Sequence, residues 1–301
     1  MYKRQPLSQE RSESGLILPT WGENNQQGFF LQNGGYYFAI NDYVDLAVLG
    51  DVYTNGSWAI RLESNYALRY KFNGSFSLRF ENLINGQRGF PDFSKSNNYY
   101  LRWSHAQNAQ SNPNSRFSAS VNLGSSQYFR QSLNEINQSQ NVTNTFSSSI
   151  SYYKKFVGTP FNMNMSLTHT QNTNTEQIDM NLPSLQLSMD RIYPFASKNG
   201  TKKNAIQKLG LIYNMDLQNR LTTTDEDFFT AEMFRNARSG ARHTASLSTN
   251  IKALNYVTIS PSANYTETWV LKTIDRRFDE TLPEGNQVVT DTINGLSLIH
   301  I

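Results

Sequence analysis

The chain of 301 residues contains no cysteine. This absence excludes disulfide bonds, thiolate catalysis and cysteine-based metal sites. Long apolar runs are absent as well, because no stretch approaches the roughly 18 consecutive apolar residues that a transmembrane helix requires. A helical membrane protein is therefore excluded, and the choice narrows to a membrane β-barrel or a soluble β-protein.

An excess of charge of one sign is also absent. The formal net charge is +3, and the lysines and arginines are scattered without the basic stripe that tracks nucleic-acid phosphates. We therefore expect no nucleic-acid partner. The mean hydropathy of -0.58 is low, but it does not exclude a barrel, because half of the residues of a barrel strand face a wet lumen. Residues 1–20 lack the apolar segment of a signal peptide, so we expect the N-terminus of an exported protein to lie upstream.

The feature that is present is a long alternation of apolar and polar residues between Trp58 and Phe72. Soluble strands usually have about five or six residues, whereas a tilted membrane strand needs roughly 9 to 11. The length of the alternation therefore favours a membrane strand. The apolar parity contains Trp58, Ile60, Leu62, Tyr66, Leu68, Tyr70 and Phe72, and the other parity contains Ala59, Arg61, Glu63, Asn65, Arg69 and Lys71.

The same period of two recurs along the chain, which is the mark of strands with one apolar face. It predicts an all-β fold, a partial transmembrane antiparallel β-barrel of about a dozen long strands with open edges. The recurrences lie at 44–53, 75–81, 117–123, 161–168, 209–217 and 257–269. Aromatic residues near the expected strand ends predict interfacial girdles; they are Tyr53, Trp58, Tyr70, Phe76, Tyr152, Phe156, Tyr265 and Trp269.

Two glycine turns set the expected register. A three-residue loop at 54–56 would pair Val52 with Trp58, and a similar loop at 72–74 would pair Tyr70 with Phe76, each with glycine in the left-handed position. Pro183 marks an expected switch of parity within a later strand. Long connections are expected to alternate with short ones, as at the two rims of a barrel.

No motif points to an enzyme. The histidines lie far apart and lack metal-ligand spacing, so we expect no catalytic residue, no metal site and no cofactor. The acidic residues 225–227 are interpreted as the cap of a short loop helix, with a calcium site as the alternative. Charged residues of the polar parity form an expected lumenal wall, either mutually neutralised and solvated or a passage for an amphipathic substrate. They are Asp51, Arg61, Glu63, Arg69, Arg79 and Glu81.

Several runs resemble the barrel of the LptD family of outer-membrane lipopolysaccharide-assembly proteins. The run Ser14–Thr20, followed by Gly28–Leu46, is similar to the start of that barrel. The residues around 228–243 and the run Ile259–Tyr265 look like a later part of it. The resemblance covers most of Gly15 to Gly295.

The resemblance implies a translocon and not an enzyme, located in the outer membrane of a Gram-negative bacterium. The implied partners are lipopolysaccharide, outer-membrane lipid, a lipoprotein plug in the lumen and a periplasmic lipopolysaccharide-bridge protein. It also implies a lateral gate on the first barrel strand, expected at 28–40, where glycines would either loosen pairing or bend a barrel corner. The candidate gate residues are Gly28, Asn33, Gly34, Gly35, Tyr36 and Tyr37.

The expected organisation has three parts. Residues 1–27 form a linker into the barrel, residues 28–295 form the partial barrel, and residues 296–301 form a tail. The two ends look like translated adapter sequence, so we expect a fragment of a longer protein. Two alternatives stay open: another transport barrel, such as a porin or plugged receptor, and a secreted soluble β-rich adhesin.

Overall fold

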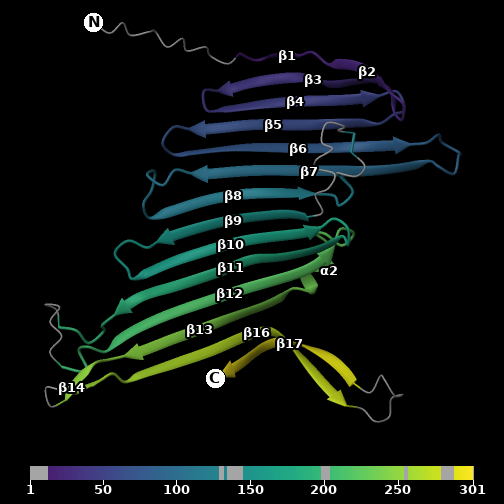
Figure 1. Cartoon of the computed structure of the whole chain (residues 1–301). Helices are drawn as coiled ribbons and strands as arrows, with labels where there is room; N and C mark the ends of the chain where they lie inside the picture. Colours follow the sequence, from purple (N-terminus) through teal and green to yellow (C-terminus); the bar gives the residue numbers. More distant parts are fainter. Residues whose placement is uncertain are drawn as a thin grey trace, which may run out of the picture. The chain divides into compact units, whose positions relative to one another are not determined.

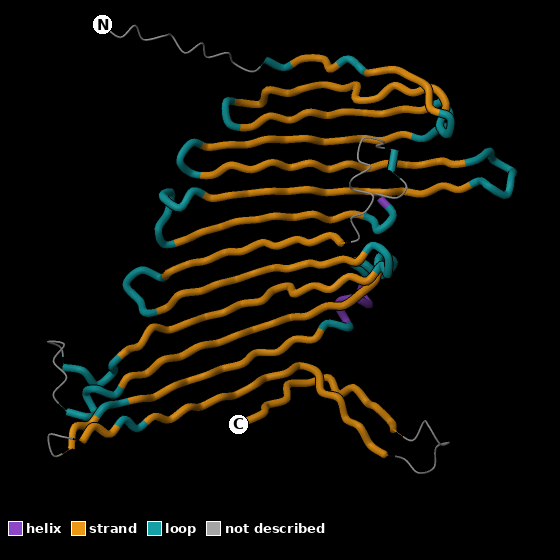
Figure 2. Tube along the Cα trace, in the orientation of Figure 1, coloured by secondary structure: helices purple, strands orange, loops and turns teal. Residues whose placement is uncertain are grey.

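The structure is a computed structural model that describes residues 13–128, 132–133, 145–197, 204–253, 257–278 and 288–300. These residues are almost entirely β-strand, and helix is confined to short segments (Figure 2). A 15-stranded sheet in sequence order dominates the fold, beside a separate two-stranded hairpin. The all-β antiparallel fold predicted from the alternation is therefore confirmed. No helix in these described ranges is long and apolar enough to cross a membrane.

The strands that make up the sheet run side by side from β1 to β17 (Figure 1). From β3 to β13, and again in β16 and β17, each strand has ten residues or more, the length expected for spanning strands. The bounds are β1 Gly15–Ile17, β2 Thr20–Asn24, β3 Gly28–Asn41, β4 Val44–Tyr53, β5 Trp58–Leu68, β6 Phe72–Asn85, β7 Ser94–Gln107, β8 Ser115–Gly124, β9 Thr145–Lys155, β10 Phe161–Asn172, β11 Gln177–Ile192, β12 Gly210–Thr224, β13 Arg238–Ser248, β14 Ile251–Ala253, β15 Val257–Ile259, β16 Ser262–Phe278 and β17 Val288–His300, with helix α2 at Ala231–Arg235.

The chain divides into two compact units. The first contains Met1–Asn112, Phe117–Ser148 and Thr170–Glu176, and the second contains Pro113–Arg116, Ser149–His169 and Gln177–Ile301. Each has a sheet with one largely apolar face and one largely polar face.

The first predicted turn is confirmed. Between β4 and β5, Val52 pairs with Trp58 and Asp51 with Ala59, and Gly56 has a φ of 91°, so glycine occupies the left-handed position that the turn requires.

The second predicted turn is wrong, because the chain reverses at 69–71 and Leu68 pairs with Phe72. Gly74 lies within β6 instead. A Cβ on Gly74 would come within 2.3 Å of the Tyr66 hydroxyl oxygen. The glycine is therefore needed to seat the Tyr66 ring, and it does not make a turn.

The exposure of side chains in the first unit is the reverse of that in a soluble protein. On β6, Phe80 is 38% exposed, while its neighbours Arg79 and Glu81 are 5% and 0% exposed. On the adjacent strands, Val52 and Ile60 are 54% and 46% exposed. Soluble folds bury apolar side chains and expose charges. The apolar face of this sheet is therefore turned outward, as expected for contact with lipid.

Two β-bulges preserve this sidedness. In β3 the register with β4 shifts between Leu31 and Gly34. Phe29 and Leu31 are exposed before the shift and Phe38 and Ile40 after it, so an extra residue changes the parity and keeps apolar side chains on one face. In β11 the register shifts between Asn181 and Ser184, which confirms the parity switch predicted at Pro183.

The ends of the described chain belong to the sheet. Within the range expected to be a linker, β1 and β2 both pair with β3. Within the expected tail, Leu298 of β17 pairs with Trp269 of β16. These segments can pair because β3 and β16 each offer the hydrogen-bonding groups of a strand edge. Residues 1–12 and 301 lie outside the described residues.

Candidate functional site

The polar face of the first unit contains a buried charge cluster formed by Asp51, Arg79 and Glu81. Arg79 Nη2 donates to Asp51 Oδ2 at 2.9 Å, and Arg79 Nε lies 3.7 Å from Glu81 Oε1. The three residues come from β4 and β6, and alternation turns all of them to the same face. A buried carboxylate without a partner would be costly, so the pairing with Arg79 makes burial of both acids tolerable.

A segment between β8 and β9 closes over this cluster. Ser132 Oγ donates to Glu81 Oε1 at 2.6 Å, and the Leu133 backbone N–H donates to Glu81 Oε2 at 2.8 Å. Leu133 is buried in a small apolar cluster with Tyr53, Ala59 and Leu83. The described residues 125–128 and 132–133 therefore cover part of the polar face, and we name them the inward segment.

Tyr128 fixes the other end of the inward segment. Its ring stacks on Tyr100 of β7, with the ring centroids 5.0 Å apart. Burial raises the pKa of Tyr128 to about 12, and the negative charge of Glu81 adds to the rise. Tyr128 is therefore a neutral side chain at neutral pH, and its packing does not require a counterion.

The other expected wall residues lie outside the buried cluster. Arg61 forms an ion pair with Glu63, with Nε and Oε1 3.2 Å apart, and Glu63 is half exposed. Arg69 lies in the turn at 69–71, where its guanidinium packs 4.8 Å from the centroid of the Tyr70 ring. Of the six predicted wall residues, the structure joins Asp51, Arg79 and Glu81 directly and leaves Arg69 at the rim.

Asn33 links the candidate gate strand to this wall. Its backbone N–H donates to Asp51 Oδ1 at 2.7 Å, and its side-chain oxygen accepts a hydrogen bond from Arg61 Nη2. Asn33 has a φ of 58°, a left-handed conformation that asparagine tolerates better than most residues. The bulge in β3 is thus held by two residues of the polar wall.

The remaining candidate gate residues serve mainly in packing. A Cβ on Gly35 would lie 1.9 Å from the Val48 carbonyl oxygen, so glycine is required for the close approach of β3 to β4. Gly28, with a φ of 77°, begins β3. The Tyr36 ring packs against Phe38, and the Tyr37 hydroxyl donates to Asp45 Oδ2 at 3.3 Å.

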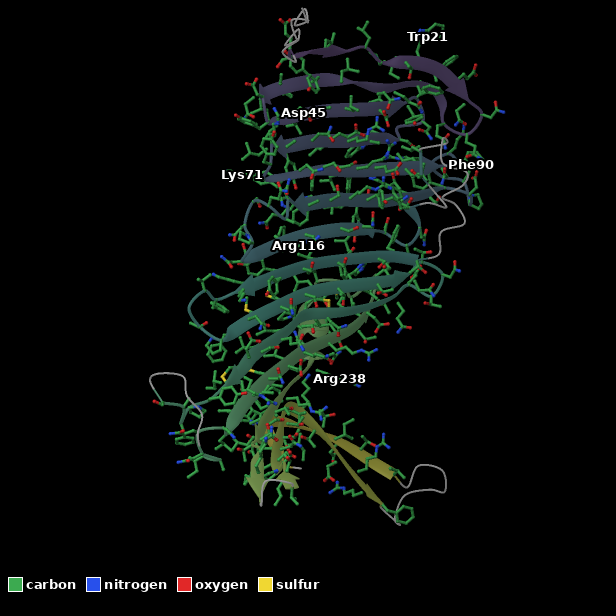
Figure 3. All side chains as sticks on the ribbon, turned by 60° about the vertical axis from the view of Figure 1, so that its left-hand side comes forward. Trp21, Asp45, Lys71, Phe90, Arg116 and Arg238 are labelled. Atoms are coloured by element: carbon green, nitrogen blue, oxygen red, sulfur yellow. The ribbon has the colours of Figure 1, made fainter. Side chains whose placement is uncertain are left out.

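The free side of β3 is occupied, which corrects the expectation that β3 is the edge strand of the sheet. Ile17 of β1 pairs with Gly35 and Thr20 of β2 pairs with Gln32, so the pairing stops at Leu18 and Pro19. Proline has no N–H to donate to a ladder, and the bulge at Asn33 lies opposite the same point. We name β1, β2 and the residues between them the edge segment; Trp21 projects from it with an exposed fraction of 85% (Figure 3).

The sequence pattern did not predict the aromatic clusters on the apolar faces, which include histidines that it described only as lacking metal-ligand spacing. In the first unit the Tyr66 hydroxyl lies 2.9 Å from His105 Nδ1 and accepts a hydrogen bond from Trp103 Nε1 at 2.8 Å. In the second unit the Tyr213 hydroxyl lies 2.7 Å from His243 Nδ1. Spacing within one strand gave no signal for these clusters, because the residues of the first come from β5 and β7 and those of the second from β12 and β13.

The predicted girdle residues do not all lie on the apolar face. Trp58 packs against Phe80, with their ring centroids 5.7 Å apart, on the apolar face of the first unit. Trp58 and Tyr66 are eight residues apart on β5, or about 26 Å along the strand. Even after the tilt of roughly 40° that barrel strands adopt, this spacing covers most of the ~25 Å apolar band. Tyr53, by contrast, is buried on the polar face and its hydroxyl accepts a hydrogen bond from Gln32 Nε2.

The acidic residues 225–227 do not cap helix α2 with their side chains. Thr230 is the N-cap residue, and its side chain accepts from the Met233 N–H. Met233 is buried in an apolar cluster with Ile178, Met180 and Leu221. Among the described residues, no group of histidine and acidic side chains is arranged to hold a metal ion.

Comparison with models of known protein families gives a match. The family model described as LptD protein matches residues 2–300, nearly the whole chain. No curated protein matches the chain. The match agrees with the outward apolar face and the long antiparallel strands. The chain belongs to the LptD family, a family of outer-membrane β-barrel proteins that act in lipopolysaccharide transport.

Proposed function

We propose that the chain forms part of the barrel wall of a translocon that inserts lipopolysaccharide into the outer leaflet of the outer membrane. The proposal rests on the exposure of side chains in the first unit, where apolar Phe80 is exposed between buried Arg79 and Glu81. One face suits hydrocarbon and the other suits the sugars and phosphates of a glycolipid. The proposal includes a lipoprotein plug against the polar face and a periplasmic bridge protein that delivers the lipid.

We further propose that the edge segment forms one side of a lateral gate. Its backbone pairing with β3 is interrupted at Leu18 and Pro19, opposite the bulge at Asn33. A strand that lacks ladder hydrogen bonds separates at a lower cost in free energy. The proposed gate therefore comprises residues 15–24, one strand before the residues that the sequence resemblance indicated.

A disulfide lock tests the gate, because the chain has no cysteine of its own. Leu16 pairs with Tyr36 across β1 and β3, and directly opposed residues in antiparallel strands lie within the range that a disulfide spans. The double substitution Leu16→Cys and Tyr36→Cys is introduced into the full-length protein as the sole copy in a cell. Surface lipopolysaccharide is then measured by labelling intact cells before and after addition of a reductant.

We expect the oxidised lock to stop delivery and the reductant to restore it. The matched control joins Ile60 to Phe80, a cross-strand pair on the same face within β5 and β6, and should deliver at the normal rate in both states. Full delivery through the oxidised Leu16–Tyr36 lock would refute the gate. Loss of delivery in the control as well would show that cross-linking acts on barrel assembly and would remove the support for a gate at this edge.

A further inference from the structure

A hollow of about 740 Å³ lies on the polar face of the second unit, over β12, β13 and β16. Its volume falls in the range of small-molecule sites, roughly 300 to 1,000 Å³. The charged side chains that line it are Asp216, Arg220, Arg238, Arg242 and Lys272. The opposite face of β12 has Met215 and Leu217, so alternation separates the hollow from the apolar face.

Strand register explains why the cations gather there. Arg220 pairs directly with Arg238, and Asp216 pairs with Arg242, which in turn pairs with Thr268 on β16. Directly opposed residues project from the same face of a sheet. Opposed arginines repel each other, so the Arg220–Arg238 pair does not stabilise the sheet by charge. The pairing therefore indicates that this surface is arranged to bind an anion.

The cations of the hollow are poorly neutralised by the protein. Among the described residues that line it, Asp216 is the only acid, against three arginines and one lysine. Arg220 reaches Asp179 at 3.7 Å, in a largely exposed ion pair, and Lys272 Nζ donates to the Arg235 carbonyl oxygen. Within the described part of the chain, Arg238 and Arg242 form no ion pair. Two guanidinium groups are thus available to an external anion, and Arg238 is marked on β13 in Figure 3.

We propose that this hollow binds phosphate groups, and that in the translocon it holds the phosphates of the lipopolysaccharide headgroup. The inference rests on the proposed function and extends it to a particular site and chemistry. A planar guanidinium offers paired N–H donors that match the oxygens of a phosphate, and such charge-assisted pairs are among the stronger hydrogen bonds in proteins. Arg238 and Arg242 supply these paired N–H donors. Lys272 adds a positive charge, and Thr268 adds a hydroxyl donor.

Binding of three probes to the detergent-solubilised full-length protein tests the site. The probes are lipopolysaccharide, the same lipopolysaccharide after enzymatic removal of its phosphates, and inorganic phosphate as a competitor. The test variant is Arg238→Gln with Arg242→Gln. The matched control is Arg276→Gln with Arg277→Gln, two exposed arginines of β16 outside the hollow. Heat-modifiable gel migration confirms that each variant is folded.

We expect the test variant to bind lipopolysaccharide at least tenfold more weakly than the unmodified protein, with a smaller dependence on salt, and the control to bind normally. Arg242→Lys should give an intermediate loss of affinity for lipopolysaccharide, because lysine keeps the charge but lacks the paired N–H donors of a guanidinium. Competition by millimolar inorganic phosphate would indicate a general phosphate site, and its failure would restrict the site to the lipid headgroup. Both results support the inference.

Equal binding of phosphorylated and dephosphorylated lipopolysaccharide would overturn the inference, as would normal binding by the test variant. If the unmodified protein still delivers lipopolysaccharide to the cell surface, only the phosphate site fails. If the unmodified protein does not deliver it, the proposed function fails whatever the hollow binds.

Discussion

The polar faces of the two units differ in the burial and pairing of their arginines. In the first unit Arg79 is buried between Asp51 and Glu81, and the inward segment covers Glu81. In the second unit Arg238 and Arg242 are exposed over a hollow where Asp216 is the one acid among the lining residues that the structure describes. A buried, ion-paired charge holds the fold together, whereas an exposed charge without an ion pair is available to a ligand. The same residue type thus serves structure in one unit and, in our proposal, recognition in the other.

The largest expected effect comes from removing the buried arginine. Arg79→Met leaves Asp51 and Glu81 buried without their partner, which should lower the free energy of unfolding by about 3–5 kcal/mol. Arg242→Met in the second unit should change it by less than about 0.5 kcal/mol. Urea unfolding of the full-length protein in detergent, followed by tryptophan fluorescence, measures both. Equal losses in the two variants would remove the distinction between the faces.

A charge placed on the apolar face should have the next largest effect. Leu62→Lys sets a charge against hydrocarbon near the middle of β5 and should cost about 2–4 kcal/mol. Ser77→Lys sets the same charge on the polar face opposite Glu63, where we expect little change. Unfolding in lipid vesicles compares the two variants. A similar cost for both would mean that the two faces meet the same environment.

A smaller effect is expected at the aromatic cluster of the first unit. In Gly74→Ala the new methyl group would overlap the Tyr66 ring, displacing it from Trp103 and costing about 1–3 kcal/mol. Gly15→Ala is the control, because a Cβ there meets nothing within 4 Å. Near-ultraviolet circular dichroism should show loss of the aromatic signal only in Gly74→Ala. An unchanged spectrum would show that the ring does not depend on the glycine.

Local alternation predicted much of the fold, because the side-chain period of two can be seen in the sequence of each strand alone. It gave the apolar face of β5, the turn at 54–56 and the parity switch at Pro183. It also identified the acids and arginine of the buried cluster as residues of one face. The resemblance of the N-terminal runs gave the family, which the family match confirmed.

Features that depend on distant partners could not be predicted in this way. Gly74 was predicted to lie in a turn. Its actual role is to make room for the Tyr66 ring of the neighbouring strand, and the sequence around Gly74 does not reveal that contact. The bulge at Asn33 depends on Asp51 and Arg61, which follow it by 18 and 28 residues. The covering of Glu81 depends on Leu133, 52 residues later. The hollow in the second unit was missed because its arginines are ordinary in sequence and converge only through strand register.

The sidedness of β5 is the feature on which a membrane barrel wall depends most directly. Single cysteines at 60, 61, 62 and 63, in a chain with no other cysteine, can be labelled with a nitroxide in lipid vesicles. Collision with oxygen and with a water-soluble nickel complex then reports contact with hydrocarbon or with water. We predict strict alternation, with positions 60 and 62 in hydrocarbon and positions 61 and 63 in water. Equal contact with water at all four positions would contradict the account.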